Sequence, residues 1–379
     1  MLPFGLTHEV LDAAMSEEDP ESLAAATRMR ARFSPELAAA ALTQATLRQQ
    51  ARAKFGAAAA EMFFTRAGLE QATRPEVADH HASRFLEAGV RRVIDLGCGI
   101  GSDSMAFARA GLEVVAVDVD SLTAAVAQAN LAGRAEVLRA DAREVTGQLL
   151  TPGVGVFCDP ARRADHGRLW RVEDFTPPWS TVLDLLDGRR TAGVKLGPDL
   201  PHSLIPEKVE AEWITHRGET VEVALWAGTG ANPGRRSALI MPNARLIAMA
   251  APPLQVRDLG HYLYEPAGAV IRAGAIADLG AQLDAGLLDR QVAYLTSDQL
   301  CSTAFATAFR VRQRLPFHLK ALRNWVREAQ IGVLEIKKRG IDVDPAELRK
   351  RLRLGGPTSA TLVISRTPSG SIAAVVDRV

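Results

Sequence analysis

The chain has 379 residues, 47% of them apolar, which is enough for two or three domains that each have their own core. No apolar run approaches the roughly 20 residues of a membrane span, and the N-terminus lacks a basic segment followed by an apolar core, which predicts a cytoplasmic protein with no membrane segment. The cysteines Cys98, Cys158 and Cys301 are too few for a disulfide framework and lack the spacing of zinc ligands, so we expect reduced thiols and no metal.

The net charge of +1 gives no overall indication of nucleic-acid binding, but the charge is unevenly distributed. Residues 310–353 contain 13 Lys or Arg and 5 Asp or Glu, an excess of 8 positive charges that leaves −7 for the rest of the chain. Positive charge is therefore concentrated near the C-terminus.

The first 88 residues predict a helical N-terminal region. They are rich in Ala, Leu, Arg, Gln and Glu, and they include long runs without glycine such as residues 35–55. These residue types favour helix at little cost in free energy.

Residues 89–242 have a different pattern, in which short apolar runs alternate with Ala-rich helical stretches. This alternation predicts a parallel sheet covered on both faces. Three later strands would suit an antiparallel edge of the same sheet. The expected strands are residues 93–96, 114–117, 135–138, 155–158 and 192–196, followed by 212–214, 219–226 and 237–241.

Residues 243–260 contain Pro252-Pro253 and little periodicity, which predicts a linker. The remaining residues, 261–379, predict a small α+β domain. In it we expect a helix over residues 315–331, a strand over 332–336, a second helix over 344–354 and a hairpin of strands 361–365 and 372–376.

The motif that carries most chemical information is Asp95-Leu-Gly97-Cys-Gly99-Ile-Gly101, which follows the first expected strand. Glycines at Gly97, Gly99 and Gly101 let the backbone approach a ligand where a Cβ would collide. A dinucleotide fingerprint has a different glycine spacing, and the Asp95 carboxylate would repel a pyrophosphate. Beside the cationic amino acid end of S-adenosylmethionine (SAM) the same carboxylate is attractive, so the motif favours SAM over NAD.

Three further Asp residues follow successive expected strands: Asp118, Asp141 and Asp159, the last followed by Pro160. Ligands of open α/β sheets bind at the carboxyl ends of the strands. Asp118 could accept both ribose hydroxyls, and Asp141 could accept a hydrogen bond from the adenine amino group. Either residue could instead serve only as a helix cap.

Together these residues resemble the class I SAM-dependent methyltransferases over about residues 74–241. The resemblance implies a Rossmann-like catalytic domain, SAM as cofactor and methyl transfer as the activity. Residues 63–65 and 72–78 resemble the segment that helps close over SAM in trimethylguanosine-synthase-like RNA methyltransferases, which implies that Thr73 binds the cofactor. From about residue 294 to 366 the chain resembles a THUMP-like domain, a relative of RNA-binding modules.

The reaction site departs from one pattern in this family. Members that methylate exocyclic amines have Asp or Asn, two prolines and an aromatic residue, whereas this chain has Asp159-Pro160-Ala161-Arg162-Arg163. Because the sulfonium of SAM is already activated, the enzyme needs alignment and an acceptor for the departing proton, for which Asp159 beside Pro160 is the candidate. Arg162 and Arg163 could bind a substrate phosphate, and Lys195, on the fifth expected strand, could point into the substrate cleft.

A basic helix face near the C-terminus is the candidate RNA contact. Lys320, Arg323 and Arg327 recur at spacings of three and four residues and so share one face, which could also be merely solvated. We therefore expect a cytoplasmic SAM-dependent methyltransferase that acts on RNA. The alternatives are a small-molecule methyltransferase and a non-catalytic RNA-binding protein that retains a SAM site.

Overall fold

The computed structural model describes residues 2–162 and 174–379. The chain forms two compact units, the first made of Met1–Ala211 and Val223–Gly234 and the second of Glu212–Glu222 and Arg235–Val379. Among the described residues, no helix has both the length and the apolar character needed to cross a membrane.

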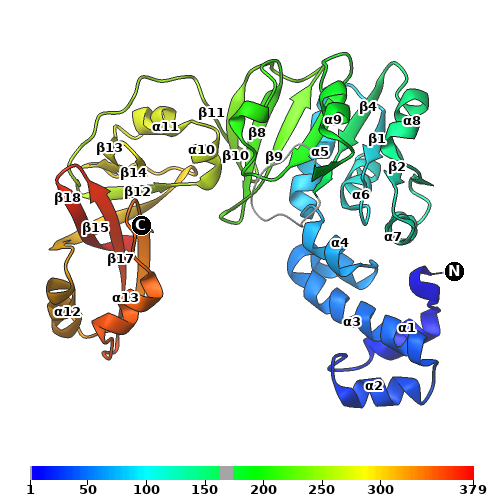
Figure 1. Cartoon of the computed structure of the whole chain (residues 1–379), viewed down its shortest axis with the longest axis horizontal. Coiled ribbons are helices and arrows are strands. Elements are labelled where there is room, and N and C mark those ends of the chain that lie inside the picture. Colours follow the sequence, from blue (N-terminus) through cyan, green and yellow to red (C-terminus); the bar gives the residue numbers. More distant parts are fainter. Residues whose placement is uncertain (1, 163–173) are drawn as a thin grey trace. The chain divides into compact units, whose positions relative to one another are not determined.

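The first unit begins with a run of helices, drawn in blue in Figure 1. Hydroxyl groups of Thr7, Ser22, Ser34 and Thr65 cap four of them by accepting a hydrogen bond from the N–H three residues later. The helical N-terminal region predicted from the sequence is therefore present. Its elements are η1 (Pro3–Gly5), α1 (His8–Met15), α2 (Leu23–Arg30), α3 (Pro35–Phe55), η2 (Gly56–Ala60), α4 (Arg66–Gln71) and α5 (Pro75–Glu87).

The rest of the first unit is an α/β layer. Its strands have the order β9-β7-β4-β1-β2-β3, and all are parallel except β9, which runs antiparallel to β7. The predicted parallel sheet and its antiparallel edge are confirmed. The strands are β1 (Arg92–Leu96), β2 (Glu113–Asp118), β3 (Glu136–Arg139), β4 (Val154–Cys158), β7 (Ala192–Leu196) and β9 (Glu219–Ala227), of which Glu219–Glu222 belong to the second unit. The other elements are α6 (Ser102–Arg109), α7 (Ser121–Leu131), α8 (Ala142–Leu149), α9 (Trp179–Leu185), a short pair β5 (Ala161–Arg162) and β6 (Phe175–Thr176), and η5 (His202–Leu204).

The N-terminal helices share a core with the turn that follows β1. Leu47 and Phe64 are buried in the same cluster as Ile100 of the turn and Leu131 of α7. Burial of apolar surface stabilises this contact by about 25 cal/mol for each Å² removed from water. The helical region therefore helps to fix the backbone of the turn.

Buried aromatic rings hold α5 on the sheet. The ring of Phe85 lies 5.5 Å from the rings of both Phe107 and Trp226, and the rings of Phe107 and Phe157 are 5.4 Å apart. Gly193 makes room for this cluster, because a Cβ there would lie 2.6 Å from the ring of Trp226. The packing holds the C-terminal half of α5 on the sheet, and Thr73 lies just before the first residue of this helix.

The second unit contains two sets of strands. The first has the order β11-β10-β8 and comprises β8 (Glu210–His216), whose first two residues belong to the first unit, β10 (Arg236–Ile240) and β11 (Ala244–Ile247). The second is a sheet of order β13-β14-β12-β15-β18-β17-β16. Its elements are β12 (Tyr262–Pro266), α10 (Gly268–Arg272), α11 (Ile276–Gln282), β13 (Gly286–Asp289), β14 (Val292–Ser297), β15 (Ala306–Pro316), α12 (Leu319–Glu328), β16 (Ile331–Arg339), α13 (Pro345–Leu352), β17 (Thr358–Thr367) and β18 (Gly370–Arg378).

Two local expectations differ from the structure. Part of the segment expected to be a linker, residues 243–260, forms β11. The helix expected over residues 315–331 begins only at Leu319, because β15 extends to Pro316, which pairs with Ile372 of β18. Strand pairing here outweighs local helix propensity. The division into domains 1–88, 89–242 and 261–379 stays a prediction.

Candidate active site

The turn between β1 and α6 needs its glycines. Gly97, Gly99 and Gly101 have φ values of +78°, +56° and +86°, in the left-handed region that favours glycine. A Cβ on Gly97 would also lie 2.8 Å from the backbone oxygen of Asp159, whereas a Cβ on Gly99 would meet no atom within 4 Å. The turn is thus closed on the side of Asp159 and open beside Gly99, where a ligand has room to approach the backbone.

Asp118 ends β2 next to this turn. One of its carboxylate oxygens accepts the N–H of Gly99 at 3.1 Å, and the other accepts the N–H of Asp120 at 2.9 Å. Partial burial raises the pKa of Asp118, although these hydrogen bonds oppose the rise. Each carboxylate oxygen can accept a second hydrogen bond, so the geometry suits the predicted ribose contact.

Asp141 follows β3, as expected, but it forms an ion pair. Its two carboxylate oxygens accept hydrogen bonds from the guanidinium of Arg143, the shortest at 2.6 Å. The same hydrogen bonds hold the pKa of Asp141 below its usual value. A contact with an adenine amino group would have to share the carboxylate with Arg143, and this role stays a prediction.

Asp95 lies deeper than the sequence indicates. It is only 1% exposed, and it accepts a hydrogen bond from the hydroxyl of Ser104. Burial, together with the negative charges of Asp103 and Asp159, raises the pKa of Asp95 to about 8. At neutral pH the side chain is therefore mostly uncharged, which weakens the charge attraction expected between Asp95 and the amino group of SAM.

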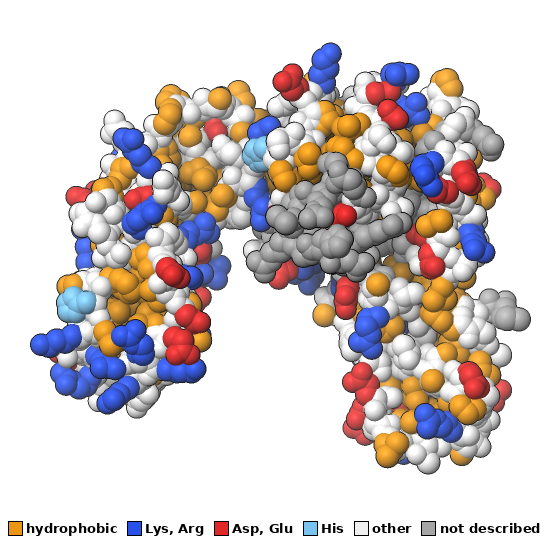
Figure 2. Space-filling model, viewed as in Figure 1, with side chains coloured by type: hydrophobic (Ala, Val, Ile, Leu, Met, Phe, Trp, Pro, Cys, Tyr) orange, Lys and Arg blue, Asp and Glu red, His pale blue; other side chains and the backbone are white. Residues whose placement is uncertain are grey.

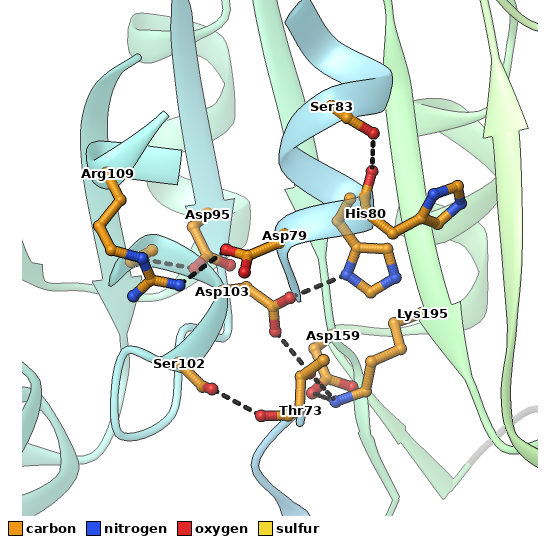
Figure 3. Close-up of polar contacts among 12 residues, drawn as sticks. Thr73, Asp79, His80, Ser83, Asp95, Ser102, Asp103, Arg109, Asp159 and Lys195 are labelled. Atoms are coloured by element: carbon orange, nitrogen blue, oxygen red, sulfur yellow. Dashed lines mark hydrogen bonds and ion pairs between the residues drawn. The ribbon is translucent and has the colours of Figure 1, made fainter. Parts of the chain in front are cut away.

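Asp159 and Lys195 meet at the carboxyl ends of β4 and β7 (Figure 3). The ammonium of Lys195 lies 2.5 Å from a carboxylate oxygen of Asp159 and donates a second hydrogen bond to the hydroxyl of Thr73 at 3.0 Å. The Lys195 side chain is 13% exposed and that of Asp159 is 33% exposed. The structure thus brings together three residues predicted separately, with a charge pair at the accessible end of the group.

Two buried residues behind this group were missed in the sequence. Asp103 accepts hydrogen bonds from Thr73 at 2.6 Å and, on its other oxygen, contacts the ring nitrogen Nδ1 of His81 at 2.8 Å. Burial alone would raise the pKa of Asp103, but the contacts with His81, Lys195 and Thr73 together lower it. An Asp in the first turn of a helix and a His on an apolar face give no sequence signal for this pairing.

Side-chain amides also connect the N-terminal region to the glycine turn. Asn130 of α7 accepts the N–H of Phe63 at 2.7 Å and donates to the carbonyl of Ile100 at 2.9 Å. Gln44 of α3 binds the N–H and carbonyl of Phe64 in the same way, at 3.0 and 2.7 Å. Neither amide was predicted, because contacts 20 to 67 residues apart leave no local pattern.

Of the other residues predicted near Asp159, Pro160 is buried directly after it. The backbone of Arg162 pairs with Phe175. Arg163 lies outside the described residues. Within the described part of the chain, no group of three or more His, Cys, Asp or Glu could hold a metal ion.

The chain is similar over most of its length to an uncharacterized S-adenosylmethionine-dependent methyltransferase of Mycobacterium tuberculosis, with 34% identity over 361 residues and coverage of 92% of this chain and 98% of the relative. This chain belongs to the SAM-dependent methyltransferases. An uncharacterized methyltransferase of Mycobacterium bovis is 28% identical over 172 residues, which cover 41% of this chain and 70% of that protein. A family model described as a methyltransferase domain matches residues 93–150.

The likeness to a solved structure covers the whole chain. A crystal structure of a Porphyromonas gingivalis protein assigned as a methyltransferase has a TM-score of 0.80 with this chain at 21% identity, covering 100% of this chain and 99% of that one. A family model described as THUMP domain-like matches residues 306–378, and one for a domain of unknown function matches residues 8–51. The expected class I fold with a helical N-terminal region and a C-terminal THUMP-like domain is confirmed.

In the THUMP-like segment of this methyltransferase, the predicted basic residues line a groove of about 770 Å³. Lys320, Arg323 and Arg327 are exposed on α12, and Arg353 follows α13 on the other side. Figure 2 shows Lys and Arg side chains gathered over this end of the second unit, with apolar side chains among them. The apolar residues that line the groove are Leu319, Val326, Ile331 and Leu352.

Proposed function

We propose that this protein transfers the methyl group of SAM to RNA in the cytoplasm. The observation that carries the RNA assignment is the groove lined by Lys320, Arg323, Arg327 and Arg353 within the segment that matches a THUMP domain-like family model. Guanidinium and ammonium groups around a concave surface with apolar patches suit a phosphate backbone whose bases are partly unstacked.

For the cofactor we propose the residues at the carboxyl ends of β1, β2 and β3. The open space beside Gly99 leaves room for SAM against the turn, and Asp118 retains hydrogen-bond capacity for the ribose. We assign Gly97 and Gly101 to the same turn. Asp95, Thr73 and Asp141 complete the proposed cofactor site.

SAM, when bound, supplies a methyl group on a positively charged sulfur. As the acceptor takes up this methyl group it would release a proton, which the carboxylate of Asp159 would accept, with Pro160 fixing the backbone there; S-adenosylhomocysteine would be the other product. No aromatic residue follows Pro160, so we propose that charged side chains rather than stacking hold the acceptor, with Arg162 and Lys195 on the substrate side.

The test uses labelled SAM with separate pools of tRNA, rRNA, protein and small metabolites. The proposal expects label in an RNA pool. RNA binding is then measured as a function of salt concentration for the unmodified protein and for the triple change of Lys320, Arg323 and Arg327 to Gln. The triple change should weaken RNA binding and reduce the salt slope by at most about one for each phosphate group that is no longer bound.

A matched control changes three exposed arginines of the N-terminal helices, Arg30, Arg52 and Arg66, to Gln. Arg48 is unsuitable for this purpose because it is buried and donates to the carbonyl of Met62 at 2.8 Å. If both triple variants bind RNA as tightly as the unmodified protein does, the groove is merely solvated. Label in metabolites alone would favour a small-molecule methyltransferase, and RNA binding with no transfer to any pool would favour a non-catalytic role.

A further inference from the structure

A continuous chain of polar contacts runs from the interior to Asp159 (Figure 3). It begins at Nδ1 of His81 and passes through the two carboxylate oxygens of Asp103 to the hydroxyl of Thr73, over 2.8 and 2.6 Å. The hydroxyl accepts from the ammonium of Lys195 at 3.0 Å, and that ammonium lies 2.5 Å from Asp159. Residues from α5, α6, β4 and β7 are thereby joined in one network.

The inner part of this network is almost completely removed from solvent. His81 is 0% exposed, Thr73 5% and Asp103 6%. Burying polar and charged groups costs free energy even when they are paired, and well-packed apolar residues often stabilise a core as much or more. The aromatic packing already holds α5 on the sheet, so fold stability alone does not explain a buried carboxylate and imidazole here.

The charges around Asp159 explain what the network can do. Asp103 on α6 is ionised, because its contacts with His81, Lys195 and Thr73 outweigh its burial and lower its pKa. Asp95 on β1 is mostly uncharged at neutral pH, because burial and then the charges of Asp103 and Asp159 raise its pKa. Lys195 is a cation in direct contact with Asp159. Lys195 also repels Lys54 of α3: burial, followed by the charges of Lys195 and Arg74, lowers the pKa of Lys54 to about 8.

Charge attraction draws the ammonium of Lys195 toward Asp159 without fixing its orientation, whereas hydrogen bonds are directional. The hydroxyl of Thr73 supplies one, and Asp103 orients that hydroxyl by accepting its proton. Because the Thr73 hydroxyl donates to Asp103, its lone pairs point to Lys195. His81, in turn, occupies the second oxygen of Asp103 and keeps the carboxylate in one orientation.

We propose that Lys195 is a positioning residue that keeps Asp159 ionised and aimed at the acceptor, and that the chain His81, Asp103 and Thr73 holds Lys195 in that place. The inference rests on the proposed function, since it takes Asp159 as the proton acceptor. An ionised Asp159 can only accept the proton of the acceptor, whereas a protonated one would donate. After methyl transfer the proton on Asp159 leaves for water, which the neighbouring ammonium of Lys195 favours.

The first test follows the titration of Asp159 by NMR of protein labelled with ¹³C in the Asp carboxyl groups, with the signal assigned by its loss in Asp159→Asn. Lys195→Met should raise the pKa of Asp159 by about 1 to 3 pH units, because an opposite charge at this distance is lost while the charge of Asp103 remains. Lys195→Arg should restore most of the original value. Lys208→Met, at an exposed lysine of the same unit, is the matched control and should change nothing.

The second test addresses the buried part of the network. Thr73→Val removes the hydroxyl and should shift the titration of Asp159 in the same direction as Lys195→Met, whereas Thr73→Ser retains the hydroxyl and should reverse the shift. With any acceptor that takes up label from SAM, the acid limb of kcat should move to higher pH in Lys195→Met and in Thr73→Val. A structural role alone would lower the melting temperature without moving this limb.

Unchanged titration of Asp159 in both Lys195→Met and Thr73→Val would overturn the inference, and so would equal shifts in Thr73→Val and Thr73→Ser. If the Met variant does not fold, Lys195→Gln is measured instead, and Thr73→Val still decides. The NMR measurement needs neither RNA nor SAM. A protein that methylates no RNA therefore refutes the proposed substrate, while the titration still decides whether Lys195 controls Asp159.

Discussion

Removal of the Asp118 carboxylate should weaken SAM binding strongly. In the structure its two oxygens already accept the N–H groups of Gly99 and Asp120, and the remaining lone pairs are the ones we assign to the ribose hydroxyls. A hydrogen bond to a charged group contributes about 1.5 to 3 kcal/mol. If Asp118→Ala loses the equivalent of one such bond, the Kd for SAM should rise about tenfold to a hundredfold or somewhat more.

Isothermal titration of the purified protein with SAM and with S-adenosylhomocysteine measures this change directly. Asp118→Asn keeps one acceptor oxygen and should lose less affinity than Asp118→Ala. Asp120→Ala removes the cap of α7, in which Asp120 accepts the N–H of Thr123 at 2.8 Å, and it controls for indirect loosening of this edge. NAD should not bind to the unmodified protein, because we assign the glycine turn to SAM.

The reasoning is refuted if Asp118→Ala weakens the free energy of SAM binding by less than about 0.5 kcal/mol, which is less than a typical hydrogen bond contributes. Asp118 would then act only on the backbone of the turn, through Gly99 and Asp120. If Asp120→Ala lowers SAM affinity as much as Asp118→Ala does, the conclusion is the same. The loss would then arise from a changed backbone at this edge of the sheet and not from a missing hydrogen bond to the ribose.

Three further changes test the same site. Asp159→Asn should reduce single-turnover methyl transfer about a hundredfold or more while the Kd for SAM stays nearly constant, and lost SAM affinity in a folded variant would reassign Asp159 to the cofactor. Gly97→Ala should lower the free energy of unfolding in urea by about 1 to 3 kcal/mol, because its φ is +78° and the new Cβ would lie 2.8 Å from the oxygen of Asp159; Gly99→Ala, with open space around it, should cost less. Folding raises the pKa of Asp95 from an ordinary value of 3.8 to about 8, so the folded state binds the proton more tightly than the unfolded state. The free energy of unfolding should therefore fall as pH rises from about 4 to 8, by up to about 1.4 kcal/mol per pH unit. In urea unfolding of Asp95→Asn, the free energy of unfolding should depend less steeply on pH in that window. If the slope is the same as in the unmodified protein, Asp95 is ionised in the folded protein.

The sequence predicts the cofactor edge of the sheet well because the relevant signals are local. An apolar run followed by glycines at Gly97, Gly99 and Gly101 determines a strand and a turn within a few residues. An Asp directly after a strand must lie at the carboxyl edge of a parallel sheet, which places Asp118 and Asp159 without any knowledge of the rest of the fold.

The network behind Asp159 could not be predicted for the opposite reason. The contact between Thr73 and Lys195 spans 122 positions, and that between Thr73 and Asp103 spans 30. Such contacts depend on how α5 packs against α6 and the sheet, which the aromatic cluster of Phe85 and Trp226 determines. A buried His such as His81 has the same sequence pattern whether it only packs or also binds a carboxylate.

The N-terminal boundary of α12 is a third case, in which local helix propensity and tertiary strand pairing conflict. The sequence predicts a helix that includes Leu315 and Pro316, yet these residues pair with Ala373 and Ile372 of β18. The cap of α12 is then His318, whose Nδ1 accepts the N–H of Ala321 at 3.1 Å. Helix propensity differs by less than about 1 kcal/mol for each residue, so a few strand pairs suffice to move such a boundary.

The proposed cofactor and RNA sites can be tested separately because they lie in different units of the chain. The residues assigned to SAM and to the acceptor belong to the first unit, and the cations of the groove belong to the second. A change at Asp118 should therefore raise the Kd for SAM and leave RNA binding unaltered, while the triple change at Lys320, Arg323 and Arg327 should do the reverse. If each change weakens both kinds of binding, the sites are coupled or the variants are partly unfolded, and the unmodified protein distinguishes the two. Coupled sites require that saturating RNA changes the Kd for SAM in the unmodified protein, by the same factor by which saturating SAM changes the Kd for RNA. If neither ligand changes the Kd of the other, the shared loss in the variants arises from partial unfolding.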